Sequence, residues 1–257
     1  MTMGLINSEI TFDWLSRHFN GSGSRIAVVD SGIDARHAEL SGSVVDAVSL
    51  SEEDMGIALR PLAADACNDG FGHGTAVASV IRSIAPGAEL VDVRVLNEFN
   101  ACSGEVLIAG LRWCIDQGLP LVNVSLATIK AKYRLELIDL CEKAYTQGTI
   151  LVASKRNFGP IGFPAEFSNV ISVDRESYPE LYRVNFRPRD QVEFDARGVN
   201  IRVAAPGGGY TEMTGTSFAT PHVTAYCALL RQAFPDILPF ELKAVLKKLS
   251  RDFAPDV

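Results

Sequence analysis

Short apolar runs rich in β-branched residues alternate along this chain with longer stretches of helical periodicity. The expected strands are residues 25–29, 90–95, 119–124, 149–153 and 170–173. The expected helices are residues 75–84, 106–117 and 135–147. Strands that alternate with helices in this way predict an α/β fold, in which helices cover a mostly parallel sheet.

Two regions depart from this alternation. Near the N-terminus, one face of a short helix is marked by four apolar residues: Ile10, Phe12, Leu15 and Phe19. From residue 177 to 209 the pattern becomes polar with short alternating pieces, which predicts antiparallel or edge strands. No repeat or linker divides the 257 residues, so we expect a single domain over residues 1–257, with residues 1–24 as a helical lead-in.

Composition narrows the classes of function. The chain has 24 Lys and Arg against 31 Asp and Glu, a net charge of −7, which argues against nucleic acid or an anionic membrane as partner. Its apolar runs are far shorter than the roughly 20 residues of a membrane span. The 5 cysteines form no C-x-x-C pair and no signal-peptide pattern is present, which favours a cytoplasmic setting over secretion.

Three residues with catalytic potential occur in suggestive local settings. Asp30 ends an apolar strand, where open α/β sheets place their sites, although an aspartate there also commonly caps a turn. His73 lies between two glycines directly before a helix, so little crowds its imidazole. Ser217 opens a helix, where backbone N–H groups can stabilise an oxyanion. A serine nucleophile needs such a base, and the base needs a carboxylate to orient it.

The sequence blocks around these residues resemble the subtilase family of serine proteases over about residues 25–234. The blocks are Asp30-Ser31-Gly32, Gly72-His73-Gly74-Thr75 and Gly215-Thr216-Ser217-Phe218-Ala219-Thr220-Pro221-His222. The resemblance implies a three-layer fold and peptide hydrolysis through an acyl-enzyme without a cofactor. Asp30 would orient His73, which would act as general base and then acid, and Ser217 would be the nucleophile.

The same resemblance implies further site residues. Asn157 occupies the position of the side chain that donates to the oxyanion. Two segments would flank an extended peptide or protein substrate, and their residues are Ser125, Leu126 and Ala127 on one side and Cys102, Ser103 and Gly104 on the other.

Two departures from the family pattern bear on function. Lys155 and Arg156 replace the small residues that usually precede the oxyanion asparagine. Either these cations line the pocket for the residue before the scissile bond and favour an acidic side chain, or they face solvent and displace Asn157. The chain also lacks the acidic insertion that binds calcium in many relatives, so we expect no metal site. No inhibitory prodomain is visible before the first strand.

The leading hypothesis is therefore a serine endopeptidase. One alternative is a transpeptidase or macrocyclase, in which an amine captures the acyl-enzyme, although no insertion is long enough to form a water-excluding lid. A second alternative is a pseudoprotease that binds peptides without turnover, if Lys155 and Arg156 distort the oxyanion segment.

Overall fold

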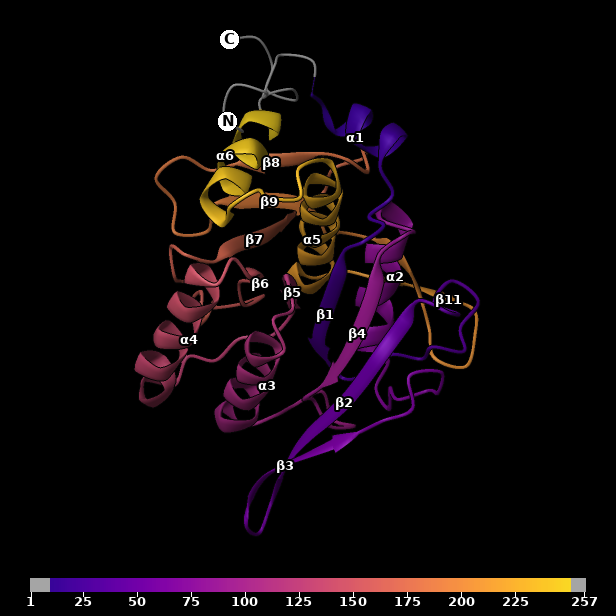
Figure 1. Ribbon diagram of the computed structural model, residues 1–257, viewed down its shortest axis with the longest axis vertical. Helices are drawn as coiled ribbons and strands as arrows, with labels where there is room; N and C mark the ends of the chain where they lie inside the picture. Colours follow the sequence, from indigo (N-terminus) through magenta and orange to yellow (C-terminus); the bar gives the residue numbers. More distant parts are fainter. Residues whose placement is uncertain (1–9, 251–257) are drawn as a thin grey trace.

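The computed structural model describes residues 10–250 and is built around one nine-stranded sheet (Figure 1). The strand order is β3-β2-β4-β1-β5-β6-β7-β9-β8. The strands are β1 (Arg25–Asp30), β2 (Val44–Glu53), β3 (Gly56–Pro61), β4 (Glu89–Arg94), β5 (Leu121–Val124), β6 (Ile150–Ser154), β7 (Ile171–Glu176), β8 (Val184–Phe186) and β9 (Phe194–Arg197). All neighbouring pairs are parallel except β2 with β3 and β8 with β9.

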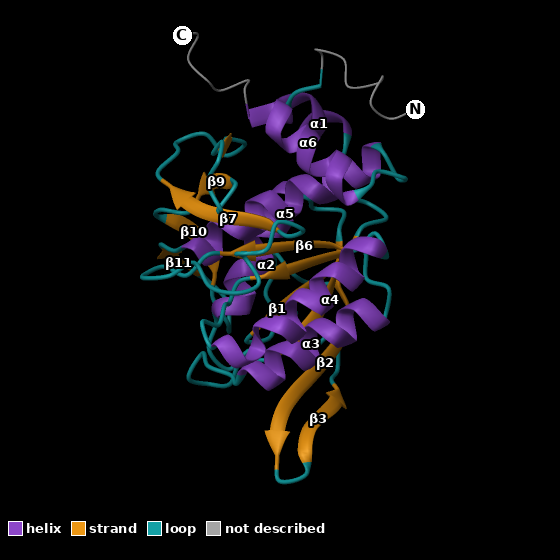
Figure 2. Cartoon of the chain, turned by 90° about the vertical axis from the view of Figure 1, so that its left-hand side faces the viewer, coloured by secondary structure: helices purple, strands orange, loops and turns teal. Residues whose placement is uncertain are grey.

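Helices cover both faces of this sheet, which confirms the expected three-layer α/β fold (Figure 2). One face carries α1 (Phe12–His18), α2 (His73–Ile84), α5 (Thr216–Ala233) and α6 (Pro239–Leu249). The other face carries α3 (Gly104–Asp116) and α4 (Arg134–Thr146), the latter preceded by the 3-10 turn η2 (Ala131–Tyr133). A separate antiparallel pair is formed by β10 (Ile201–Ala204) and β11 (Tyr210–Met213).

Strand β1 shows why the central strands have continuous apolar sequences. Ile26 and Val28 pack into the core beneath α2 and α5, whereas Ala27 and Val29 pack into the core beneath α3. Successive side chains of a strand point to opposite faces, and here both faces are buried. Each residue of the strand interior therefore has to be apolar.

The topology brings several loops to one edge of the sheet. Strand β1 is central, with β4 on one side and β5 on the other, so the chain reverses its direction of winding there. Because these strands are parallel, Asp30, Ser125 and Lys155 all emerge at the carboxyl edge. Ligand sites in open α/β sheets lie at such a reversal point.

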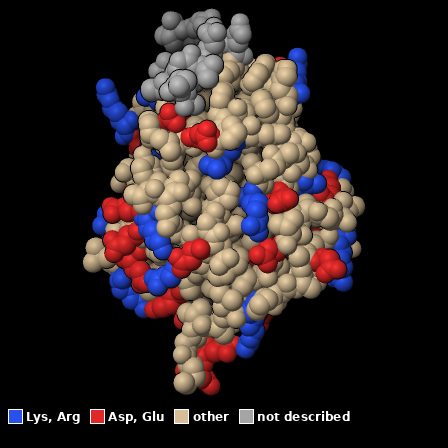
Figure 3. Space-filling model, viewed as in Figure 1, with Lys and Arg blue, Asp and Glu red and all other residues tan. Residues whose placement is uncertain are grey.

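The hairpin formed by β2 and β3 is a feature that the hydrophobic pattern did not predict. It extends from the end of the sheet in Figures 1 and 2, and its tip contains the exposed acidic residues Glu52, Glu53 and Asp54. Elsewhere on the face of Figure 3, basic and acidic side chains are intermixed.

Some expectations concern the chain as a whole. All five cysteines are free thiols, three of them buried, and the expected cytoplasmic setting stays a prediction, as does the single-domain organisation. Within residues 10–250, no helix has the length and apolar character needed to cross a membrane. The same residues contain no group of three or more His, Cys, Asp or Glu side chains arranged to hold a metal ion.

Candidate active site

Asp30 and His73 form the buried acid and base pair of the site. His73 Nδ1 lies 2.7 Å from Asp30 Oδ1, and the Ser31 backbone N–H donates to the same oxygen at 2.7 Å. An ionised carboxylate can only accept, so Nδ1 carries the proton and Nε2 is left as the basic nitrogen. The glycines beside His73 permit this approach, because a Cβ on Gly74 would lie only 2.2 Å from the Gly32 carbonyl oxygen.

The surroundings of His73 favour its protonated form. Burial alone lowers the pKa of the imidazole, since only 8% of the residue is exposed. The charge and hydrogen bond of Asp30, with a further contribution from Asp69, outweigh burial and raise the pKa above its ordinary value of 6.5. A raised pKa makes His73 a stronger base for taking a proton from a hydroxyl.

A second buried carboxylate, Asp69, organises the turn that presents His73. Its Oδ1 accepts from Ser31 Oγ at 2.9 Å and from two backbone N–H groups of the turn, those of Phe71 and Gly72. Its Oδ2 accepts from the backbone N–H and the hydroxyl of Thr75. Asp69 was not among the predicted site residues, although its position just before the Gly-rich turn was an available signal.

Asp69→Ala is expected to lower the free energy of unfolding by about 3 kcal/mol, because buried donors lose a charged acceptor. For a chain of this size the melting temperature should fall by roughly 6–12 °C. Thermal unfolding followed by circular dichroism checks this, with the exposed Asp65→Ala as control. A melting temperature within a degree of the parent would contradict this role of Asp69.

Ser217 lies near the start of α5, and its position is fixed by an exchange of hydrogen bonds with Ser125. Ser217 Oγ donates to the Ser125 carbonyl oxygen at 3.2 Å, and Ser125 Oγ donates to the Ser217 carbonyl oxygen at 3.1 Å. The second bond is possible because Pro221, inside the helix, has no N–H to donate to Ser217. Among the described residues Ser217 makes no hydrogen bond to His73, although both line one cleft of about 520 Å³. Such bonds often form fully only with substrate bound.

Asn157 lies directly beside the nucleophile. Its Oδ1 accepts from the Thr216 backbone N–H at 3.0 Å and from the guanidinium of Arg175 on β7. Both contacts hold the amide oxygen, which leaves the Nδ2 donors free to serve the cleft. Arg175 is a second residue that sequence reasoning missed.

The two cations that precede Asn157 differ in their surroundings. Lys155 Nζ forms an ion pair with Asp174 Oδ2 at 2.6 Å, and the charge of Lys155 helps to keep the Asp174 pKa below its usual value against the effect of burial. Arg156 lines the cleft and has no charged partner within residues 10–250. Asn157 stays hydrogen-bonded to the start of the Ser217 helix beside these two cations. Their role in the pocket stays a prediction.

The expected substrate segments flank the cleft to different degrees. Ser125, Leu126 and Ala127 line it together with Ser217. Cys102 and Ser103 line an adjoining hollow that shares Leu96 with the cleft. Gly104 is buried at the start of α3, where a Cβ would lie 2.1 Å from the Tyr133 ring, so this glycine is also required for packing. Peptide binding by these segments stays a prediction.

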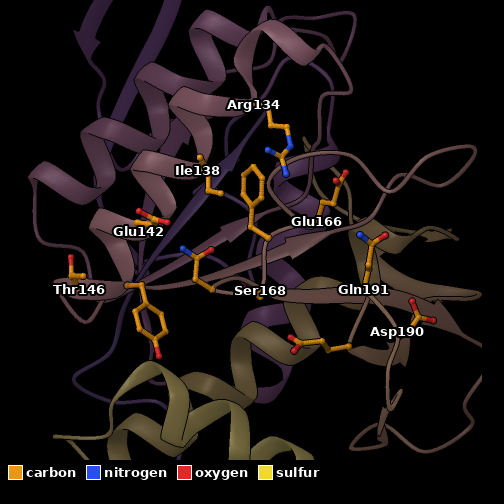
Figure 4. Close-up of a pocket in the computed structure, with 12 residues that line it drawn as sticks. Arg134, Ile138, Glu142, Thr146, Glu166, Ser168, Asp190 and Gln191 are labelled. Carbon is orange, nitrogen blue, oxygen red and sulfur yellow. The ribbon is translucent and has the colours of Figure 1, made fainter.

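A larger hollow, of about 630 Å³, lies between α4 and the loops near residues 166–169 and 190–193 (Figure 4). Its labelled side chains include Arg134, Glu142, Glu166 and Asp190, which surround an open space. None of the three catalytic candidates lines it. We therefore assign the chemistry to the smaller cleft, where the base, the nucleophile and an amide donor meet.

The site combines a buried carboxylate, an oriented imidazole and a serine at a helix start, all at the carboxyl edge of a parallel sheet. Serine hydrolases that work through an acyl-enzyme use this set of groups. Comparison with known proteins gives the family. The model of the Subtilase family matches residues 21–255, and the chain belongs to this family.

Several relatives show how far the similarity extends. Alkaline elastase YaB of Bacillus sp. (strain YaB) is 30% identical over 243 residues, which are 90% of this chain and 60% of the elastase. Minor extracellular protease Epr of Bacillus subtilis (strain 168) is 33% identical over 241 residues, 89% of this chain but 35% of that protein. A solved structure, of a cold adapted subtilisin-like serine proteinase, has a TM-score of 0.72 and 26% identity, and the match covers 90% of this chain and 83% of that one.

Proposed function

We propose that this protein is an endopeptidase that hydrolyses extended segments of peptides or proteins through an acyl-enzyme on Ser217. The observation that carries the proposal is the cleft itself, which holds His73, oriented by Asp30, and Ser217 beside the segment Ser125–Ala127. By name, the relatives given above are an elastase, one extracellular protease and a proteinase, which agrees with action on peptide bonds.

The chemistry follows from the positions of the groups. His73 Nε2 takes the proton of Ser217 Oγ while this oxygen attacks the scissile carbonyl carbon. The imidazolium, stabilised by Asp30, then gives the proton to the departing amine as the carbon–nitrogen bond breaks. Water repeats the sequence on the ester: His73 takes a proton from water, the new oxygen bonds to the acyl carbon, and Ser217 leaves with the proton.

Charge develops on the carbonyl oxygen in both steps, and Asn157 would stabilise it together with the Ser217 backbone N–H. Arg175 contributes through Asn157, since its guanidinium donates to the amide oxygen. This contact fixes the orientation of the amide and draws electron density away from Nδ2, which strengthens Nδ2 as a donor. Arg175 is therefore a positioning residue for the oxyanion donor.

Removing Asn157 as Asn157→Ala is expected to lower kcat by about a hundred- to a thousandfold. Arg175→Met should lower kcat by about tenfold with KM little changed, and it should have no further effect in the Asn157→Ala background. A double-mutant cycle on kcat checks this, with the exposed Arg60→Met as control. Additive losses would show that Arg175 does not act through Asn157.

The proposed function is tested with a long peptide blocked at both ends, followed by mass spectrometry. An endopeptidase cuts it internally and leaves one new carboxyl and one new amine terminus. Products joined to an added amine would instead identify a transpeptidase. Peptide binding with neither product nor labelling by a fluorophosphonate would identify a pseudoprotease, and either of these outcomes overturns the proposal.

A further inference from the structure

The acyl side of a bound substrate can be located from the proton transfers. His73 has to reach the departing amine, so the amine side of the peptide lies toward His73. The acyl side then lies on the opposite flank of Ser217, between Ser125–Ala127 and the segment Ser154–Phe158, both of which line the cleft. The side chain that precedes the scissile bond enters between these two segments.

Arg156 lines the cleft on the side of the segment Ser154–Phe158. A Cβ placed on the buried Gly162 would lie 3.1 Å from Arg156 Cδ and 3.2 Å from Ala127 Cβ. The aliphatic part of Arg156 and the Ala127 side chain therefore both lie against Gly162. The guanidinium of Arg156 lies near Gly159, since its Nη1 would be 3.4 Å from a Cβ added to that glycine. The backbone beneath the side chain is fixed, since Arg156 N–H donates to the Ile161 carbonyl oxygen at 2.9 Å.

No side chain within residues 10–250 neutralises the charge of Arg156. Three cations occur together near the oxyanion segment, and two of them have assigned partners: Lys155 pairs with Asp174, and Arg175 donates to Asn157. The guanidinium of Arg156 has no hydrogen bond or ion pair within residues 10–250. A cation in a cleft without its own anion is a site for an anionic group of a ligand.

We propose that Arg156 makes this pocket select an acidic side chain at the substrate position before the scissile bond. The inference rests on the proposed endopeptidase function and specifies its substrate class. The guanidinium, which has donors in a planar fork, can donate hydrogen bonds to the carboxylate of an incoming acidic side chain.

The test is a series of blocked peptides that differ only at this position, with Glu, Asp, Gln, Leu or Lys. Gln matches Glu in shape and lacks only its charge, so the ratio of their kcat/KM values isolates the electrostatic contribution. We expect kcat/KM for the Glu peptide to exceed that for the Gln peptide by about tenfold. The ratio should not be much larger, because Arg156 is partly exposed and solvent weakens its pairing with the carboxylate. The ratio should fall as salt is added.

Variants assign the preference to Arg156. Arg156→Gln should bring the Glu to Gln ratio close to one, and Arg156→Glu should favour Lys over Gln. The control Arg112→Gln removes an equal charge on α3, which lies outside the cleft, and should leave the ratio unchanged. A parent enzyme without a Glu preference, or one that keeps it in Arg156→Gln, overturns the proposal.

Two measurements distinguish failure of the endopeptidase function from failure of the pocket. A protein that is not an endopeptidase would cleave none of the peptides and would form no fluorophosphonate adduct. The pocket is then tested by equilibrium binding of peptides that end in Glu or Gln, with fluorescence anisotropy. Tighter binding of the Glu peptide to the parent, lost in Arg156→Gln, supports the pocket without catalysis; equal binding of the two peptides contradicts it.

Discussion

Ser217→Ala is expected to abolish acylation and to lower kcat on the order of a millionfold, the loss that removal of the nucleophile causes in a subtilisin. The methyl group cannot attack a carbonyl, and His73 then has no hydroxyl to deprotonate. The fold should survive, because the variant loses only the bond from Ser217 Oγ to the Ser125 carbonyl oxygen.

Intact-mass spectrometry after incubation with a fluorophosphonate checks this prediction. The parent should gain the mass of one adduct, and Ser217→Ala should gain none. Ser168→Ala replaces an exposed serine outside the cleft and should label like the parent. An adduct that persists in Ser217→Ala would place the reactive nucleophile elsewhere.

Asp30→Asn is expected to lower kcat on the order of ten-thousandfold and to shift the pH dependence of the residual activity. Catalysis requires neutral His73, so kcat/KM of the parent should rise with pH through the His73 pKa, which lies above 6.5. The charge of Asp30 raises that pKa, whereas burial lowers it. Without the charge, the His73 pKa falls and the rise in kcat/KM should occur at lower pH.

The pH dependence of kcat/KM between about pH 5 and 9 measures the shift, and the imidazole resonances of His73 give its pKa directly by NMR. Asp139→Asn, an exposed substitution on α4, serves as the control for a loss of negative charge. An unchanged midpoint in Asp30→Asn would mean that Asp30 does not govern the ionisation of His73.

The sequence predicted the central sheet because its strands are buried on both faces. The runs around Val28 and Val152 are apolar throughout, which distinguishes them from amphipathic segments. The β2 and β3 hairpin lacks this signal, since much of its length is exposed and its sequence includes Ser51, Glu52 and Glu53. Its strands are stabilised by pairing in the sheet, which a local pattern does not report.

The catalytic candidates could be recognised because each has a distinctive local setting. The residues that support them were harder to recognise, because some of the contacts that define their roles join positions distant in the chain. Asp69 reaches Ser31 across a separation of 38 positions, and Arg175 reaches Asn157 across 18. The ion pair of Lys155 with Asp174 likewise joins the end of β6 to β7, which become neighbours only in the sheet. Before this pair was known, Lys155 and Arg156 could not be told apart as candidates for binding an anionic group.

Helix α5 has a consequence for how this protein is made. It packs against β5, β6, β7, β9 and α2, and it carries Ser217, whereas Asp30 and His73 belong to the first third of the chain (Figure 1). A chain still emerging from the ribosome therefore contains the acid and the base but no nucleophile. The proposed hydrolysis therefore requires that this late helix dock on a sheet whose first strands were made long before it.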